Sequence, residues 1–139
     1  MFTIFTYGHG NGGHFYSLAS TAKALASKCE VSIVNFGFGK SAVLENSGLK
    51  IINISNGNFG HLKTYRRFRK VIKEENPQVL HSFCILSFFY VRIYCVFHPL
   101  KKILTKCGGP DPKGYFPLAD ELILYSQENF KYFSGLRKF

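Results

Sequence analysis

Four glycines lie between the first apolar run of the chain and the first stretch of helical periodicity, in the segment GHGNGG at residues 8–13. Glycine lets backbone N–H groups approach an anion, and the start of a helix adds partial positive charge. Gly12 and Gly13, followed by His14, are therefore candidates for contact with a phosphate. The spacing is neither G-x-G-x-x-G nor that of a P-loop, so a tight turn without a ligand is an equal alternative.

Two further candidates, His81 and Lys106, lie at the ends of later apolar runs. Ligands of open α/β sheets bind at the carboxyl ends of the strands. His81 could act as a base or a hydrogen-bonding group, although a buried, hydrogen-bonded core histidine is the more common role. Lys106 could contact a phosphate or a sugar hydroxyl, and Lys113 lies in the loop that follows it.

A fourth candidate is a basic face on a predicted helix at residues 61–75. At 100° per residue the apolar side chains share one side of this helix: Leu62, Tyr65, Phe68 and Ile72. The opposite side carries four basic residues: Lys63, Arg66, Arg67 and Lys70. A face of one sign favours contact with anionic lipid or a phosphorylated acceptor over the default, a solvated face. Nucleic acid is a weaker competitor because no RNA- or DNA-binding motif is present.

The elements that must position these residues alternate between strand-like and helix-like patterns. Strands are predicted at residues 1–7, 31–36, 50–54, 78–82, 101–106 and 121–125. Helices are predicted at residues 14–28, 41–47, 61–75, 84–97 and 126–133. The alternation predicts an α/β fold, a Rossmann-like three-layer α/β/α domain with a mostly parallel sheet of about six strands. The helix at 84–97 is almost entirely apolar, which predicts a central position covered on both sides.

Composition agrees with one folded domain. The chain has 139 residues, of which 46% are hydrophobic and 19% charged, and its net charge of +10 favours anionic partners. Its four cysteines form no C-x-x-C pair, so neither zinc nor another metal is implied, and free thiols in a reducing cytoplasm are expected. Cys107 has no evident histidine partner and is interpreted as inert.

Neither of two apolar stretches of the chain is interpreted as a membrane or export signal. Residues 1–7 lack a basic start and a small-residue cleavage site, so they are expected to form a buried strand. The stretch 79–100 carries Arg92 near its middle, and such a charge is costly in lipid. It is therefore interpreted as a short strand followed by a helix.

Several of these features, in this order, resemble the amino-terminal half of the family 4 glycosyltransferases, which have the GT-B fold of two facing Rossmann-like domains. The matching features are a first strand leading into Gly12-Gly13, the run NPQVLH at 76–81, the strand end KCGGP at 106–110, and ADELILYS at 119–126. The last of these is similar to the family's "AD-x-hydrophobic-S" strand. The resemblance covers nearly the whole chain.

The resemblance implies that residues 1–139 are a single domain, the acceptor-side half of a glycosyltransferase whose donor-binding half is absent from this sequence. The parent enzyme would move a sugar from a nucleotide-sugar donor to a saccharide or lipid-linked acceptor, in polysaccharide or glycoconjugate synthesis. It would need no metal and no cofactor besides this donor substrate. The isolated domain would not transfer sugar.

The resemblance also implies roles for the candidate residues. Gly12, Gly13 and His14 would face the donor phosphates, while His81, Lys106 and Lys113 would line the acceptor side. Two departures prevent assignment of catalytic residues. Phe83 replaces the second histidine of the family's H-x-H pattern, and Lys106-Cys107 stands where many members have a histidine near the transferred sugar.

The expected partners are the missing donor domain, the acceptor and an anionic membrane surface, which places the protein in the cytoplasm, peripherally on the inner face of the cell membrane. Two alternatives stay open. One is a stand-alone Rossmann-like domain that binds a nucleotide or an anion without catalysis. The other is a basic nucleic-acid-binding domain.

Overall fold

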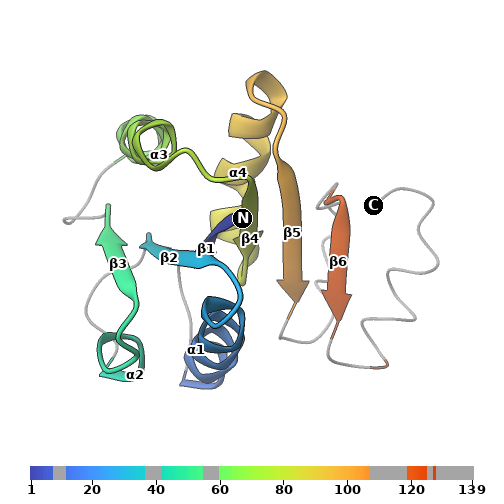
Figure 1. The fold of residues 1–139 in the computed structure, drawn as a ribbon. Helices are drawn as coiled ribbons and strands as arrows, with labels where there is room; N and C mark the ends of the chain where they lie inside the picture. Colours follow the sequence, from blue (N-terminus) through green and yellow to red (C-terminus); the bar gives the residue numbers. More distant parts are fainter. Residues whose placement is uncertain (8–11, 37–41, 55–59, 107–118, 125–126, 128–139) are drawn as a thin grey trace.

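Among the residues that the structure describes, six parallel strands form one sheet in the order β3-β2-β1-β4-β5-β6 (Figure 1). This computed structural model describes residues 1–7, 12–36, 42–54, 60–106, 119–124 and 127. The strands are β1 (Phe2–Tyr7), β2 (Glu30–Asn35), β3 (Lys50–Asn53), β4 (Val79–Ser82), β5 (Lys101–Lys106) and β6 (Glu121–Leu124). The predicted α/β class and parallel sheet are confirmed.

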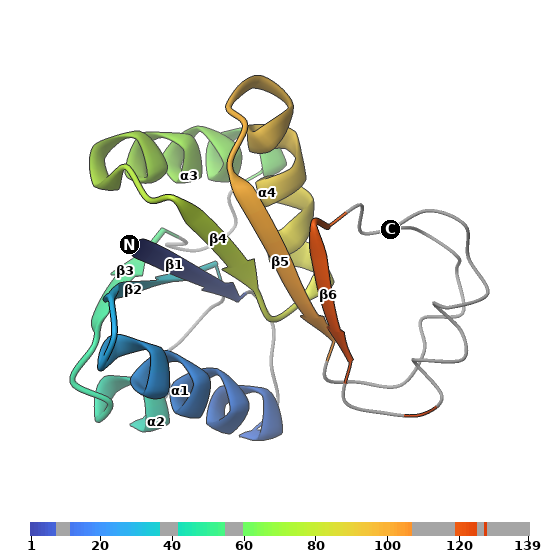
Figure 2. The same cartoon turned by 45° about the vertical axis from the view of Figure 1, so that its right-hand side comes forward.

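Helices cover both faces of the sheet (Figure 2). They are α1 (Gly12–Ala26), α2 (Ala42–Glu45), α3 (His61–Glu75) and α4 (Ile85–Phe97). The first two lie on one face, and the last two lie on the other. The predicted last helix, at residues 126–133, lies outside the described residues except for Gln127, which is helical.

The alternation of side chains along β1 divides the core into two clusters. Ile4 points into the cluster under α3 and α4, whereas Phe5 points into the cluster under α1. Both side chains are fully buried. Burial of a side chain of this size contributes about 1.5–3 kcal/mol, so a central strand that is apolar on both faces stabilises both layers.

Local signals set several boundaries where the sequence predicted them. The helix α3 has the predicted bounds and ends at Asn76, whose φ of 51° leaves the helical region directly before Pro77. Gly48 ends the turn after α2 with a φ of 76°, a conformation that glycine adopts without strain. The predicted start of the first helix at His14 was wrong by two residues, because α1 begins at Gly12.

Candidate functional site

The strand order reverses direction between β1 and β4, which are neighbours in the middle of the sheet. The chain leaves β1 for α1 on one face, and leaves β4 for α4 on the other face (Figure 2). In open α/β sheets, this switch point leaves a crevice at the carboxyl ends of the strands, where ligands bind. The carboxyl edge between β1 and β4 is therefore the candidate site.

The start of α1 borders this edge. Gly12 and Gly13 form the first turn of the helix and do not belong to the preceding loop, and His14 follows in the same turn. The first N–H groups of a helix have no partner within it, and the first turn of α1 contains no acidic residue. The helix start can therefore attract an anion. The side chain of His14 and residues 8–11 lie outside the described part.

The start of α4 borders the same edge from the other face. Cys84 is its N-cap, and the Cys84 sulfur accepts a hydrogen bond from the backbone N–H of Ser87 at 3.4 Å. A thiol is a weak acceptor compared with the oxygen of Ser, Thr, Asp or Asn, and the first turn of α4 also lacks an acidic residue. This positive helix end is therefore only weakly compensated by its own side chains.

A buried hydroxyl network fixes the start of α4 to β1 and β4. The Thr6 hydroxyl lies 2.7 Å from that of Ser82, and it donates to the Ser87 hydroxyl at 3.1 Å. All three side chains are fully buried. The Ser87 hydroxyl also donates to the backbone oxygen of Cys84 at 3.1 Å. The sequence did not predict this network. Its only sign in the sequence is a hydroxyl residue close to the end of each strand.

Tyr7 ends β1 beneath the same edge and is buried. Burial, together with the negative charge of Glu45, raises the pKa of the Tyr7 hydroxyl to about 12. The phenol is therefore neutral at physiological pH. It can donate a hydrogen bond, but it cannot serve as an anionic base.

His81 is a buried residue of β4, which agrees with the alternative of a hydrogen-bonded core histidine. Its Nε2 lies 2.7 Å from the Thr105 hydroxyl of β5, and its ring contacts those of Phe5 and Phe83, at centroid distances of 4.9 and 5.0 Å. Burial lowers the pKa of His81 to about 4, against the opposite effect of the negative charge of Glu121. The imidazole is therefore neutral and satisfied by Thr105. Direct contact with an acceptor stays a prediction.

The other predicted acceptor-side residues are only partly placed. Lys106 is the last residue of β5 and pairs with Leu124 of β6, so its backbone lies at the carboxyl edge. Its side chain lies outside the described part, as do Cys107 and Lys113. The structure brings the backbones of Gly12 and Lys106 to the same sheet edge. It does not test whether they share a ligand.

A third helix start lies at this edge. The N-cap of α3 is Gly60, which provides no side-chain hydrogen bond, and the first turn contains no acidic residue. His61 Nδ1 lies 2.7 Å from the Tyr90 hydroxyl of α4, so this contact joins the beginning of α3 to α4. The sequence analysis did not single out His61, because its partner is 29 residues away.

The predicted basic face of α3 is present, with one correction. Lys63, Arg66 and Lys70 are exposed and Arg67 is half-buried, but Glu74 joins this face and its carboxylate lies 3.9 Å from the Lys70 ammonium. The face is therefore not of a single sign. Leu62 is also exposed and does not join the buried side, which consists of Thr64, Phe68 and Ile72.

Two kinds of feature are missing from the described part of the chain. The His, Cys, Asp and Glu side chains of these residues form no group of three that could hold a metal ion. None of the helices described is long and apolar enough to cross a membrane.

Sequence comparison finds no matching family model and no matching curated protein. Comparison of structures does find similar folds. The chain is similar to Anabaena Alr3699/HepE solved with UDP and glucose, with a TM-score of 0.75 and 16% identity over 100% of this chain and 42% of that one. It is also similar to a glycosyltransferase from Rickettsia africae, with a TM-score of 0.70 and 14% identity over 99% and 39% of the two chains.

A third similar structure is a UDP-N-acetylglucosamine 2-epimerase, with a TM-score of 0.70 and 12% identity over 100% of this chain and 46% of that chain. The chain thus spans less than half the length of each of these structures. Identities this low establish the fold alone. The chain has the Rossmann-like fold of one half of a GT-B protein, the fold implied by its resemblance to the glycosyltransferases.

Proposed function

We propose that this chain is the acceptor-binding domain of a GT-B glycosyltransferase that transfers a sugar from a nucleotide-sugar donor to a saccharide or lipid-linked acceptor. The crevice at the carboxyl edge between β1 and β4 would receive the reacting groups. The ordered motifs of the sequence and the fold shared with a glycosyltransferase of similar architecture support this proposal.

The strongest support for the proposal is that three helices begin at the same edge of the sheet. The first turns of α1, α3 and α4 all lack acidic residues. Each start carries roughly half a positive charge on its free N–H groups. A diphosphate that leaves a nucleotide sugar develops negative charge as the bond to the sugar breaks. Preorganised N–H groups would stabilise that charge without rearrangement.

The described side chains favour binding and positioning over proton transfer at this edge. The pKa of about 4 makes the buried imidazole of His81 a weak base, and the pKa of about 12 keeps the phenol of Tyr7 protonated near neutral pH. Holding donor and acceptor in a reactive geometry can supply a large part of the rate enhancement by itself. The proposed domain would therefore contribute acceptor orientation.

Epimerisation of a nucleotide sugar is a second candidate, because the epimerase structure matches the full length of the chain as well as the glycosyltransferase does. Both reactions act on a nucleotide sugar. They differ in the product: a transferase attaches the sugar to an acceptor, whereas an epimerase returns an isomeric sugar nucleotide. Product analysis therefore separates them.

The first test is to read the coding sequence beyond Phe139. We expect it to encode a second Rossmann-like half with the paired glutamates that resemblance to the family implies for the donor site. A stop codon directly after Phe139 would contradict the proposal. It would favour the stand-alone binding domain, which predicts that the chain itself binds a free mononucleotide.

A further inference from the structure

The outer side of α4 is an exposed apolar stripe. One side of this helix packs on the sheet through Ser87, Phe88 and Val91, which are buried. On the other side four large apolar residues are exposed, by 36, 52, 75 and 73% respectively: Leu86, Phe89, Val96 and Phe97. The prediction of a helix covered on both sides was therefore wrong. Apolar residues that recur on one side of an exposed helix indicate an interaction surface, because single exposed apolar residues do not follow such a period.

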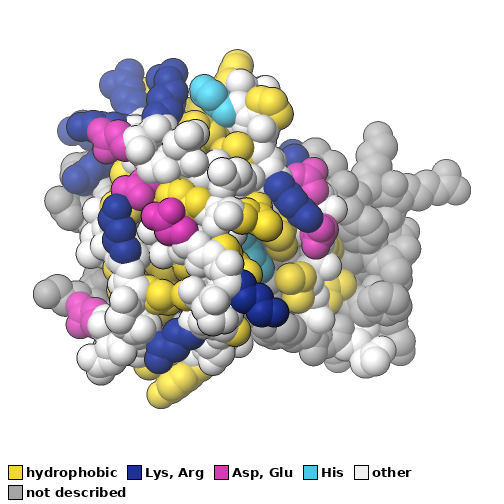
Figure 3. All heavy atoms as spheres, viewed as in Figure 1, with side chains coloured by type: hydrophobic (Ala, Val, Ile, Leu, Met, Phe, Trp, Pro, Cys, Tyr) yellow, Lys and Arg dark blue, Asp and Glu magenta, His cyan; other side chains and the backbone are white. Residues whose placement is uncertain are grey.

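Helix α3 borders this stripe. The Phe68 and Tyr94 rings meet edge to face at a centroid distance of 6.0 Å. The positive charge of Arg69 contributes to the pKa of Tyr94 by lowering it, against the larger effect of burial, so this guanidinium lies close to α4. Leu62, which is 64% exposed, adds an apolar side chain from α3. Figure 3 shows lysine and arginine side chains gathered over α3, with hydrophobic side chains beside them where α4 ends.

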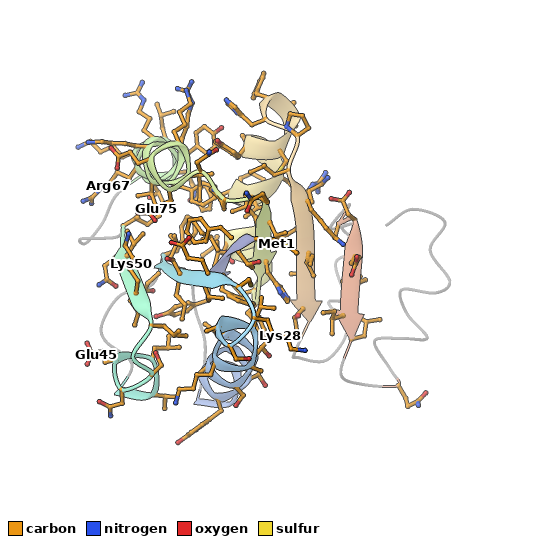
Figure 4. The ribbon with its side chains drawn as sticks, viewed as in Figure 1. Met1, Lys28, Glu45, Lys50, Arg67 and Glu75 are labelled. Carbon is orange, nitrogen blue, oxygen red and sulfur yellow. The ribbon has the colours of Figure 1, made fainter. Side chains whose placement is uncertain are left out.

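Three basic residues of α3 have no carboxylate partner among the described residues. Arg66, Arg69 and Lys73 form no ion pair with any carboxylate of the described residues. By contrast, Lys50 of β3 and two lysines of β5 are paired with carboxylates. Lys50 bonds to Glu75 at 2.6 Å, and Lys101 and Lys102 pair with Glu121 and Asp120 respectively. Figure 4 labels Lys50 and Glu75. Positive charge on α3 is thus left available beside an apolar stripe.

We propose that the surface formed by Leu62, Arg66, Arg69 and Lys73 of α3 with Leu86, Phe89, Val96 and Phe97 of α4, termed the α3–α4 face, binds the surface of an anionic lipid bilayer. Apolar side chains enter the boundary between headgroups and acyl chains, while adjacent Lys and Arg side chains contact anionic headgroups. The face supplies both components side by side on two adjacent helices.

The charge and the apolar side chains of the face argue against two other partners, a second copy of this chain and nucleic acid. A second copy of this chain would bring the basic residues of two α3 helices close together, in a protein that already carries a net charge of +10. Nucleic acid would satisfy the basic residues, but it offers no partner for aliphatic side chains such as Val96 and Leu86. A bilayer with anionic lipids is complementary to both parts.

The placement of the helices connects this face to the candidate site. Both α3 and α4 follow a strand of the parallel sheet, so they begin on the side where the strands end, and α4 begins directly after β4 at the candidate site. A domain docked through the α3–α4 face would hold that crevice beside the headgroup layer. If the proposed function is correct, this geometry favours an acceptor whose lipid part stays in the bilayer. Bilayer binding itself does not depend on that function.

The test is flotation of the chain with vesicles of phosphatidylcholine and phosphatidylserine, compared with vesicles of phosphatidylcholine alone. The Arg66→Gln/Lys73→Gln variant removes two charges from the face, and Lys23→Gln/Lys28→Gln removes two exposed charges near α1, on the opposite face of the sheet. Each basic residue near an anionic surface contributes about fivefold to the partition coefficient. We therefore expect about 25-fold weaker binding for the first variant and an effect several times smaller for the second.

The apolar part is tested with Val96→Ser/Phe97→Ser, whose side chains are exposed and cost little stability when replaced. We expect at least about tenfold weaker vesicle binding, whereas Tyr16→Ser on α1 should leave it nearly unchanged. Equal losses for the face and control variants would overturn the proposal. So would sedimentation showing that the chain dimerises and that Val96→Ser/Phe97→Ser makes it monomeric. Binding to RNA but not to vesicles would assign the face to nucleic acid instead.

Discussion

His81 of β4 and Thr105 of β5 form a buried hydrogen bond across two neighbouring strands, with 2.7 Å between Nε2 and the hydroxyl oxygen. The bond satisfies the imidazole inside the sheet, where both side chains are almost completely buried. A residue that the sequence offered as an acceptor ligand is thus a structural link between β4, whose carboxyl end borders the candidate site, and β5. Its protonation should affect stability.

The first prediction concerns the pH dependence of stability. The pKa of His81 is about 4 in the folded chain, below its ordinary value of 6.5, so the unfolded chain binds more protons between these values. The free energy of unfolding should therefore fall as the pH decreases from about 6.5 towards about 4, by up to about 1.4 kcal/mol per pH unit from this residue. Urea unfolding at a series of pH values measures the slope.

Two variants show whether His81 causes this pH dependence of the free energy of unfolding. His81→Gln can keep a hydrogen bond to Thr105 but cannot titrate, so the dependence between pH 6.5 and 4 should become flatter. Ser27→Ala replaces an exposed side chain that does not titrate in this range, so it should leave the slope unchanged. An undiminished slope in His81→Gln would show that other groups cause the acid sensitivity.

The second prediction concerns the hydroxyl network beneath α4. Ser87→Ala removes the group that accepts from Thr6 and donates to the backbone oxygen of Cys84. Because the site is fully buried, we expect a loss of about 1–2 kcal/mol in the free energy of unfolding. Ser27→Ala is the control, since that hydroxyl bonds to the backbone oxygen of Ala24 in an exposed position and should cost less than about 0.5 kcal/mol. Equal losses for the two variants would contradict a special role for the network.

The third prediction tests the start of α4 as an anion site. Cys84→Ser and Cys84→Asp both replace a weak sulfur cap with an oxygen acceptor and should stabilise the helix by about 0.5–1 kcal/mol. They differ in charge. In the whole polypeptide encoded by the reading frame that contains residues 1–139, titration with UDP should give at least about fivefold weaker binding to the Asp variant than to the Ser variant, because a carboxylate at the helix start repels the diphosphate. Equal affinities would place the diphosphate elsewhere.

The sequence predicted the fold well because each strand and helix carries its own local signal. The apolar run of β1 and the end of α3 at Asn76 and Pro77 are visible in a few neighbouring residues. The start of α1 at Gly12 was missed, because glycine has a low helix propensity and the fold decides where the helix begins. The exposed stripe of α4 was missed because apolar character does not show which sides of a helix have a partner.

The site was less predictable than the fold. Thr6 and Ser87 are 81 residues apart, and only the parallel pairing of β1 with β4 brings them together. His81 was found at the correct strand end, but the sequence does not show that Thr105, on the next strand, would satisfy it. Side-chain contacts between strands depend on register, and a pattern within one segment does not contain that information.

The most direct test of the proposed function is a product assay. The whole polypeptide encoded by the reading frame that contains residues 1–139 is incubated with radiolabelled nucleotide sugars and a membrane extract that supplies acceptors. We expect the label to move into a saccharide or lipid-linked product and the nucleotide diphosphate to be released. Label recovered as an isomeric sugar nucleotide, or left entirely in the unchanged donor for every nucleotide sugar tried, would contradict it.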